Sequence, residues 1–311
     1  MTSQTHLKNK ARAVKNIGQI TKAMEMVSAA KMRKAQESAL SARPYAKHML
    51  SLFSSLLLHM KKEGELGLSL GKVREGVVCL VVVTSNKGLC GSYNSGVMRA
   101  ALAWKERKEQ EGKRVEVVTV GKKARDVFRK REAHIAQEFL NFSEVATIED
   151  VSPVANWILQ AKEKGLYEEM TCWSTTFISA LERKATEVQI LPFSQEAIER
   201  VVEGIIPKTG KYSTWVQEER EEKETSSVLL EPTPEELLEK LSDMLVRSEM
   251  LHLILESNAA EHSSRMVAMK NASDNAKDLM ETLTLQLNKA RQANITQEVA
   301  EIAAGKEALG V

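Results

Sequence analysis

The chain has 311 residues, of which 43% are hydrophobic, 28% charged and only 5% aromatic, a composition typical of a protein with long helices. Its longest uninterrupted apolar run, residues 77–83, is too short to cross a bilayer, which argues against an integral membrane protein. The net charge of +2 hides an asymmetry, because residues 1–62 hold 12 basic and 2 acidic side chains whereas residues 235–311 hold 8 and 13. Three cysteines without CxxC spacing favour a reduced, cytosolic chain.

The N-terminal segment, residues 1–62, predicts one long helix from about Ser3 to Lys62, which Pro44 should kink. One stripe at helical spacing begins apolar and then becomes basic: Ile17, Ile20, Met24, Val27, Lys31 and Lys34. We expect the apolar half of this stripe to pack on a second helix. The basic half should face an acidic partner outside the chain.

Residues 63–233 change to alternating strand and helix patterns. Strands are predicted over residues 75–85, 114–121, 169–178 and 186–193. Helices are predicted over residues 92–110, 122–131 and 151–165. Such alternation is typical of a Rossmann-like α/β domain with a largely parallel sheet. The sequence therefore predicts an α/β domain inserted between two helical segments.

The C-terminal segment, residues 234–311, predicts a second long helix. Thr233 is the expected N-cap and Pro234 the first helical residue, and no proline follows. Steps of three and four residues trace a heptad-like seam through Leu241, Leu245, Ser248, His252, Leu255, Ala259, His262, Met266, Met269, Ser273, Ala276, Met280, Leu283, Leu287 and Ala290. Because each terminal helix needs a partner for its seam, we expect the two to pair as a long antiparallel coiled coil.

The loop "TSNKGLCGSYNSG", residues 84–96, lies between a predicted strand and a predicted helix, where phosphate-binding loops occur. Its glycines match neither GxGxxG nor GxxxxGK[ST], so we expect a structural tight turn. Cys90 would need a nearby histidine to act as a nucleophile, and His134 is the only one within residues 63–233. Since no carboxylate pair or metal-ligand cluster stands out in the sequence, we predict no catalytic, cofactor or metal site.

The basic N-terminal arm leaves alternatives open. One alternative is that the arm attracts nucleic acid electrostatically, so that the chain is a coiled-coil nucleic-acid-binding or scaffold protein. Another alternative is that the arm is only a solvated helix face. Few aromatic side chains are present there to stack on bases. At the other end, the residues after Arg291 carry little charge, which indicates insertion into a sleeve formed by another protein.

Four stretches carry a family resemblance: "ITKAMEMVSAAKMRKAQ" (20–36), "GLCGSYN" (88–94), "RMVAMKNASDNA" (265–276) and "NKARQANITQEVAEI" (288–302). In order and spacing they resemble the gamma subunit of F-type ATP synthase, over essentially the whole chain. The resemblance implies a non-catalytic central rotor shaft whose paired terminal helices enter a ring of three alpha and three beta subunits. The inserted domain would be the foot, beside the epsilon subunit and the c-ring, and ATP chemistry would belong to beta.

The resemblance also implies contacts with beta. Together with the stripe described above, it assigns them to Met24, Lys31, Lys34, Arg291, Gln292 and Thr296. The methionine would lie close to a moving beta loop and the two lysines would face acidic beta loops. Arg291, Gln292 and Thr296 would form hydrogen bonds with beta, and we call these three residues the catch.

At the foot, Glu231 matches an acidic position that touches the c-ring loops. Leu230 precedes it, where the family often has an aromatic residue. The absence of a transit peptide implies a bacterial complex, peripheral on the cytoplasmic face of the plasma membrane. No cofactor and no nucleic-acid partner are expected.

Overall fold

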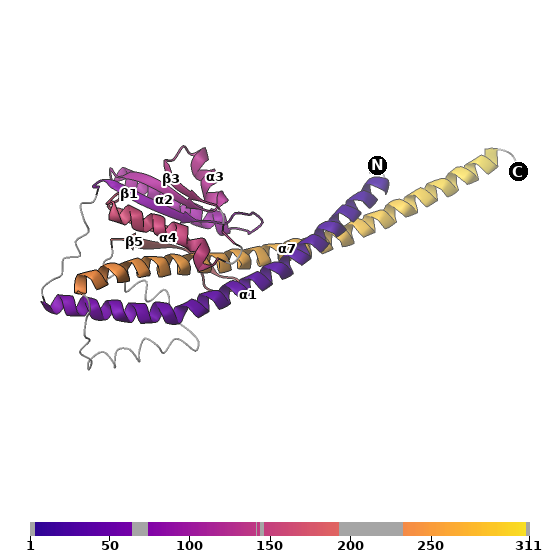
Figure 1. The fold of residues 1–311 in the computed structure, drawn as a ribbon. Helices are drawn as coiled ribbons and strands as arrows, with labels where there is room; N and C mark the ends of the chain where they lie inside the picture. Colours follow the sequence, from indigo (N-terminus) through magenta and orange to yellow (C-terminus); the bar gives the residue numbers. More distant parts are fainter. Residues whose placement is uncertain (1–3, 64–73, 141, 144–145, 193–232, 309–311) are drawn as a thin grey trace. The chain divides into compact units, whose positions relative to one another are not determined.

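The computed structural model describes residues 4–63, 74–140, 142–143, 146–192 and 233–308. Its elements in chain order begin with helix α1 (Gln4–Glu63) and end with helix α7 (Pro234–Ala308), and the described residues between them include a five-stranded sheet and the helices α2, α3 and α4 (Figure 1). The chain separates into two compact units. Unit 1 comprises Met1–Ala29 and Arg265–Val311, and unit 2 comprises Ala30–Ser264. Each unit is described by itself below.

Unit 2 is built on one sheet with the strand order β3-β2-β1-β4-β5. The strands are β1 (Val77–Val83), β2 (Arg114–Val120), β3 (Ile135–Phe139), β4 (Glu169–Phe177) and β5 (Arg183–Leu191). The first four pair in parallel, and β5 runs antiparallel to β4. The order of the parallel strands, 3-2-1-4, matches the first four strands of the doubly wound order 3-2-1-4-5-6. The predicted, largely parallel sheet is therefore confirmed.

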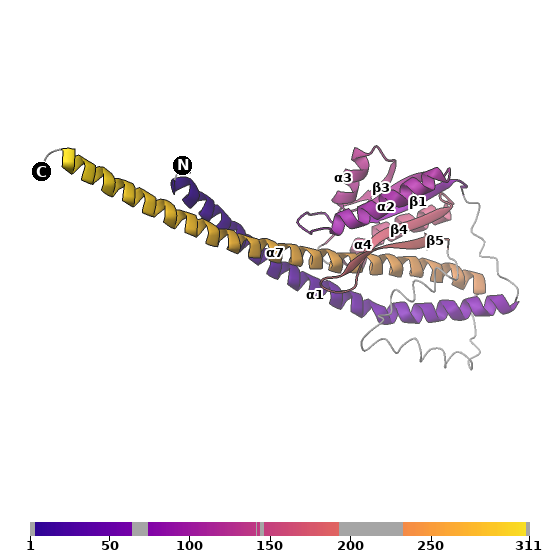
Figure 2. The same cartoon turned by 180° about the vertical axis from the view of Figure 1, so that it is seen from behind.

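Every residue of β1 is buried, because this strand lies in the middle of the sheet and both of its faces are covered. Helices α2 (Tyr93–Gln110) and α3 (Lys122–Lys130) cover one face, where Leu80, Trp104 and Phe128 form part of the core. Helix α4 (Ile148–Glu163) and part of α7 cover the other face (Figure 2). A strand buried on both faces reads as a continuous apolar run, and the β1 sequence VVCLVVV does so.

Gly121 fixes the turn from β2 into α3. Its φ is +100°, and a Cβ at this position would lie 2.2 Å from the Thr84 carbonyl oxygen. The Thr84 hydroxyl accepts a hydrogen bond from the Ala124 amide at 2.9 Å, which satisfies a donor in the first turn of α3. Only glycine permits this close approach of the two loops.

The local predictions agree with the observed elements to within a few residues. Helix α4 begins three residues before its predicted start, because Thr147 and Asp150 form a capping box. Helix α7 begins at Pro234 as predicted, and the Glu236 amide donates to the Thr233 hydroxyl at 3.4 Å. Strand β3 was not predicted, since its five residues are half-buried or exposed and lack a clear apolar pattern.

Unit 1 contains the first part of α1 and the last part of α7, and these pack together. Leu7, Ala11 and Val14 form an apolar cluster with Ala276 and Leu283. The direction of the pair is antiparallel. The Asn294 amide donates to the Gln4 side chain at 3.4 Å, and a Cβ on Gly18 would lie 3.4 Å from the Cβ of Ala276.

The predicted seam is confirmed on α7 and wrong on α1. Every seam position from Leu241 to Ala290 is buried or half-buried. On α1, however, Ile17 is 54% exposed, Ile20 59% and Val27 50%. The buried line of α1 within unit 1 consists instead of Leu7, Ala11, Val14, Thr21 and Ser28.

The physical reason for this correction is the size of the side chains. Small residues let two helix backbones approach closely, and Gly18 faces Ala276 at van der Waals distance. Thr21 is buried in the same line because its hydroxyl donates to the Ile17 carbonyl at 3.0 Å, within its own helix. Counting bulky apolar residues selected the wrong face of α1.

Candidate functional site

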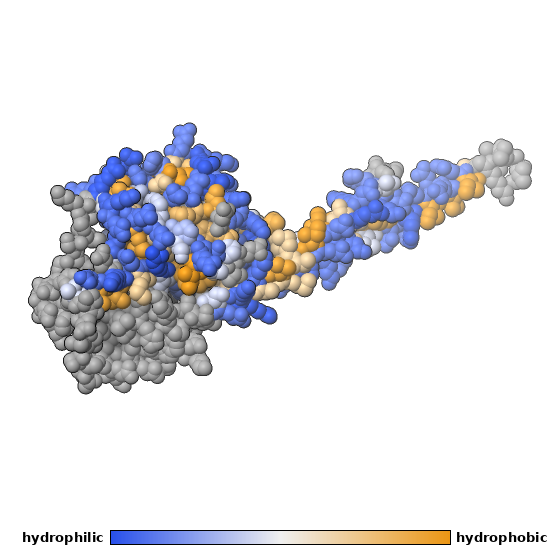
Figure 3. Space-filling model, viewed as in Figure 1, coloured by the Kyte–Doolittle hydropathy of each residue, from blue (hydrophilic) through white to orange (hydrophobic). Residues whose placement is uncertain are grey.

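The surface of unit 1 carries many large apolar side chains that no part of the unit covers (Figure 3). On α1 they are Ile17, Ile20, Met26 and Val27, and on α7 they are Leu279, Leu285, Ile295, Val299 and Ile302. Each exposed side chain of this kind lacks about 1.5–3 kcal/mol of stabilising free energy that full burial would provide. Clusters of this kind mark surfaces that bind another protein.

The last described turns of α7 are exposed throughout, from Arg291 to residue 304. Gln292, Ile295, Thr296 and Val299 follow each other at helical spacing and therefore share one face. That face combines two apolar residues with two hydrogen-bonding residues. It offers a partner both apolar area and directional contacts.

The hydroxyl of Thr296 already uses its proton, because it donates to the Gln292 carbonyl at 2.9 Å. In this rotamer the Thr296 oxygen can only accept a further hydrogen bond. The Gln292 amide can both donate and accept, and the Arg291 guanidinium only donates. A partner loop that engages all three must present both donors and acceptors.

The glycine-containing loop 84–96 is held by unit 2 itself. Leu89 has a φ of 60° and Gly91 a φ of 55°, as expected for a tight turn. The Ser85 hydroxyl donates to the Lys87 carbonyl at 2.6 Å, and the Ser85 amide donates to the Asn94 side chain at 3.1 Å. The loop is therefore an internally bonded turn.

Helix α7 packs directly against this loop. The Ser264 hydroxyl donates to the Cys90 carbonyl, the Tyr93 and Ser257 hydroxyls lie 2.6 Å apart, and Ala260 packs with Cys90 and Tyr93. In open α/β sheets, ligands bind in the crevice at the carboxyl ends of the strands where the strand order reverses. Here a helix of the same chain occupies that place.

A buried polar cluster on α7 was not predicted as a group. Glu249 and Glu256 lie two turns apart on one face, and His252 Nε2 is 3.4 Å from Glu256 Oε1. Burial, reinforced by the nearby Glu256 charge, raises the pKa of Glu249 to about 8. The only sequence signal was the i, i+7 spacing of the two acids. Among the described residues, no three His, Cys, Asp or Glu side chains form a group that could hold a metal.

Comparison with known proteins gives one consistent answer. The family model described as ATP synthase matches residues 3–309. The ATP synthase gamma chain of Chloroflexus aurantiacus is 38% identical over 311 residues, covering 99% of each chain. That of Pelotomaculum thermopropionicum is 36% identical over 310 residues, covering 99% of this chain and all of the relative. The chain belongs to the ATP synthase gamma chain family. The prediction made from the four sequence motifs is confirmed.

Solved structures with the same fold come from mitochondrial ATP synthases and are less similar to this chain in sequence. A chain from the Euglena gracilis mitochondrial ATP synthase, described as OSCP/F1/c-ring, matches with a TM-score of 0.61 at 18% identity, covering 98% of this chain and 94% of that one. A chain from the Tetrahymena thermophila enzyme, described as central stalk/c-ring, matches with a TM-score of 0.55 at 22% identity, covering 82% of this chain and 99% of that one. Gamma chains of this family are a non-catalytic subunit of ATP synthase. A nucleic-acid-binding role finds no support in these comparisons.

The residues expected from the family resemblance lie in different places. Met24 is half-buried in unit 1, where Arg291, Gln292 and Thr296 are exposed. In unit 2, Lys31 is half-buried and Lys34 exposed. Glu231 and Leu230 lie outside the described residues. No helix in the described part of the chain combines the length and apolar character that a bilayer crossing requires.

Proposed function

We propose that this chain is the central rotor shaft of an F-type ATP synthase. The shaft turns with an ion-driven c-ring and drives the beta subunits, in a ring of three alpha and three beta, through their nucleotide-binding states. The observation that carries this proposal is the set of large apolar side chains exposed on unit 1, in a chain of the gamma family. These side chains give the shaft a surface for a surrounding sleeve.

A shaft works only if its faces differ. A contact that is equal for every conformation of beta shifts no equilibrium between those conformations. The exposed residues of α1 and α7 are unequal around unit 1, because Ile17, Ile20 and Val27 project from one helix and Ile295 and Val299 from the other. Each beta subunit then meets a different combination of apolar and polar groups as the shaft turns.

The proposed contacts with beta follow from the exposure of each residue. Lys34 is exposed, so its charge is available to acidic beta loops, whereas Lys31 and Met24 offer only part of their surface. Exposed charge contacts are worth about 0.2–1 kcal/mol each, which suits a surface that must bind and release. Gln292 and Thr296, with Arg291, supply the directional catch.

We further propose that the terminal helices form a long antiparallel coiled coil, of which the described pair in unit 1 is one part. The division into residues 1–62, 63–233 and 234–311 remains our proposal for the functional parts: two shaft helices and an inserted foot. The foot would contact the epsilon subunit and the c-ring, with Glu231 and Leu230 at the c-ring contact. The likeness to a chain of the Tetrahymena thermophila central stalk/c-ring structure supports this assignment.

Catalysis in this proposal takes place in beta, and the gamma chain itself needs no cofactor. We place the complex at the cytoplasmic face of a bacterial plasma membrane, with this chain as a peripheral subunit. The relatives from Chloroflexus aurantiacus and Pelotomaculum thermopropionicum are bacterial proteins, which supports that location.

Reconstitution tests the proposal. The purified chain is mixed with alpha and beta from the same source, separated by size exclusion, and the complex is assayed for ATP hydrolysis. We expect one copy to co-elute with three alpha and three beta subunits and to support sustained hydrolysis. A chain that elutes alone and leaves hydrolysis unchanged would refute the shaft role.

The catch is tested by the double variant Gln292→Ala/Thr296→Ala, which should lower coupled ATP turnover without preventing assembly. Thr284→Ala/Gln286→Ala is a matched control. Thr284 and Gln286 are exposed on the same helix, and the Thr284 hydroxyl donates to the Met280 carbonyl in the same way as Thr296 does to Gln292. Equal turnover in the two double variants would remove Gln292 and Thr296 from the mechanism.

A further inference from the structure

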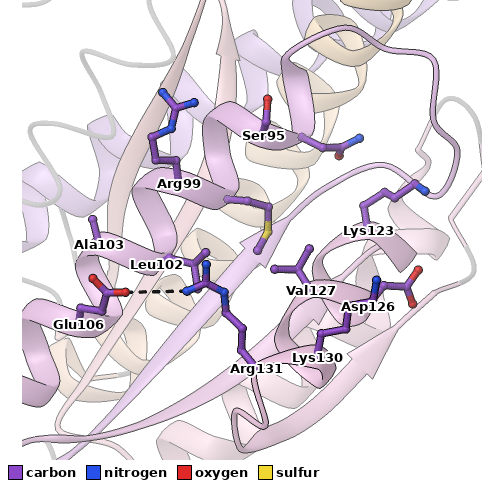
Figure 4. A pocket seen from close by; sticks show the side chains of 12 residues that line it. Ser95, Arg99, Leu102, Ala103, Glu106, Lys123, Asp126, Val127, Lys130 and Arg131 are labelled. Atoms are coloured by element: carbon purple, nitrogen blue, oxygen red, sulfur yellow. Dashed lines mark ion pairs between the residues drawn. The ribbon is translucent and has the colours of Figure 1, made fainter.

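An open groove of about 800 Å³ lies between α2 and α3 on the outer face of unit 2 (Figure 4). None of the residues proposed to contact beta or the c-ring lines it. Along α2 the groove extends from Asn94 to Glu106, a length of about 18 Å at the helical rise of 1.5 Å per residue. Its length therefore matches about three turns of a helix.

The floor of the groove is apolar. Leu102 from α2 and Val127 from α3 lie on facing sides of it (Figure 4), and Met98, which also lines the groove, is buried. Met98 and Leu102 are one helical turn apart, so they form a short apolar strip along α2. A floor of this kind binds an apolar stripe better than it binds a hydrated small molecule.

The rim of the groove is basic. Two acidic side chains, Glu106 and Asp126, line the groove, but four basic side chains line it as well: Arg99, Lys123, Lys130 and Arg131.

Both acids of the rim already have cationic partners. Arg131 lies 3.9 Å from Glu106 (Figure 4), and Arg125 lies 2.7 Å from Asp126. The Arg125 guanidinium, which hydrogen-bonds Asp126, lowers the pKa of that carboxyl. Within the described part of the chain, Arg99, Lys123 and Lys130 form no ion pair with a carboxylate within 4.0 Å. Lys123 and Lys130 act on Asp126 only through longer-range attraction, so the rim keeps a net positive charge for an external anion.

These three charges are too widely spaced for one small anion. Lys123 and Lys130 are seven residues apart on α3, which separates them by about 10 Å along the helix axis, and Arg99 projects from the other helix. A row of separate carboxylates fits this spacing, and a single phosphate does not.

We propose that this groove docks an acidic amphipathic helix of a partner protein. The apolar stripe of that helix would lie on Leu102 and Val127, and its carboxylates would face Arg99, Lys123 and Lys130. Amphipathic helices bind grooves between helices in this manner, through apolar anchors at helical spacing. The inference goes beyond the shaft role, because it concerns a face of unit 2 that carries none of the proposed beta contacts.

The test uses the assembled complex purified with this chain. A photoreactive p-benzoylphenylalanine is introduced as Leu102→p-benzoylphenylalanine, and the crosslinked peptide is sequenced by mass spectrometry. We expect a segment of another protein with net negative charge and apolar residues at helical spacing. The matched control is Leu181→p-benzoylphenylalanine, because Leu181 is exposed in unit 2 and lies outside the groove, and it should not capture that segment.

Charge reversal gives the second readout. Arg99→Glu/Lys130→Glu should lower the crosslink yield at position 102 about fivefold or more, since two exposed attractive contacts become repulsive. Lys164→Glu/Lys184→Glu changes the net charge equally at exposed positions outside the groove and should leave the yield unchanged.

A crosslink to lipid, to a basic or uncharged segment, or to nothing would overturn the inference, as would equal yields in the two charge-reversal variants. Co-elution with alpha and beta is measured on the same samples. A chain that still assembles while the groove captures nothing separates failure of this inference from failure of the shaft role.

Discussion

The two units differ in how much of their large apolar side chains they bury. In unit 2 the largest fully buried side chains, including Trp104, Phe128 and Ile158, fill the space between the sheet and its helices. In unit 1 the line between the helices combines large residues such as Leu7 and Leu283 with small ones such as Gly18 and Ala276, while Ile17 and Ile20 are exposed. Unit 2 has a core of its own, whereas unit 1 leaves much of its apolar surface for a partner.

The sequence supplies a way to observe the units separately. All four tryptophans lie within residues 30–264, and residues 1–29 and 265–311 contain no Trp, Tyr or Phe. Tryptophan fluorescence therefore follows unit 2 alone, whereas far-ultraviolet circular dichroism follows the helices of both units.

The largest effect is expected for a cavity in the core of unit 2. Leu80 is fully buried in the central strand, so Leu80→Ala should lower the free energy of unfolding by about 2–5 kcal/mol. Urea titration followed by tryptophan fluorescence measures this change. Leu181→Ala, at a position 79% exposed, should stay within about 0.5 kcal/mol of the parent, and similar losses in both variants would contradict the distinction between core and surface.

A pH-dependent effect is expected at Glu249. Its carboxyl has a pKa raised to about 8 from 4.5, chiefly by burial. Between these two pH values the folded state holds a proton that the unfolded state has lost, so stability falls as the pH rises through this window. Glu249→Gln should remove this dependence, making the variant more stable than the parent at about pH 9 by more than about 1 kcal/mol.

Urea titrations at about pH 5 and about pH 9 measure the effect at Glu249. Glu163→Gln is the matched control, because Glu163 is an exposed acid on another helix of unit 2. The same change of stability with pH in the parent and in Glu249→Gln would show that Glu249 does not control it.

In unit 1 the stability of the α1–α7 helix pair should depend on the size of the side chain at position 18. Gly18→Leu would force a large side chain against Ala276 and should destabilise the pair by about 1–3 kcal/mol. Gly18→Ala is the control, since its Cβ fits at 3.4 Å and alanine favours the helix by about 1 kcal/mol. In thermal melting followed by circular dichroism, the melting temperature should fall for Gly18→Leu and should stay equal or rise for Gly18→Ala, with the tryptophan signal unchanged in both. Equal melting of the two variants would mean that the helices of unit 1 are not tightly packed at Gly18.

The smallest effect on stability is expected where unit 1 is exposed. Ile20→Ala removes a side chain that is 59% exposed and should change stability by no more than about 0.5 kcal/mol. The same variant should weaken co-elution with alpha and beta, because the exposed apolar face is the proposed contact. Unchanged assembly together with a large loss of helix stability would place Ile20 in an internal interface instead.

The terminal helices show how far periodicity can be trusted. On α7 the predicted seam is buried from Leu241 to Ala290, but periodicity did not show that its first part packs against the sheet. A neighbouring line of the same helix, Val246, Met250 and Ile254, belongs to the core of unit 2 together with the seam residue Leu255. On α1 the same method chose the outward face, because a helix with two partners has two apolar faces and the pattern does not say which partner belongs to the same chain.

The candidate binding surface was predictable only where its residues are close together in the sequence. The exposed and weakly charged end of α7 was visible as a sequence feature, and Arg291, Gln292 and Thr296 are all exposed there. The groove between α2 and α3 was not visible, because Arg99 and Lys130 belong to different helices and become neighbours only when both helices pack on the sheet.

The sequence by itself determined the family, the order of most strands and helices, and the start of α7 at Pro234, since these depend on local patterns and on motifs within short stretches. Only the tertiary structure decided which face of α1 is internal, that α7 covers the loop after β1, and that Gly121 must approach Thr84. These are decided by contacts between residues far apart in the chain, where the fit of small side chains outweighs local hydrophobicity.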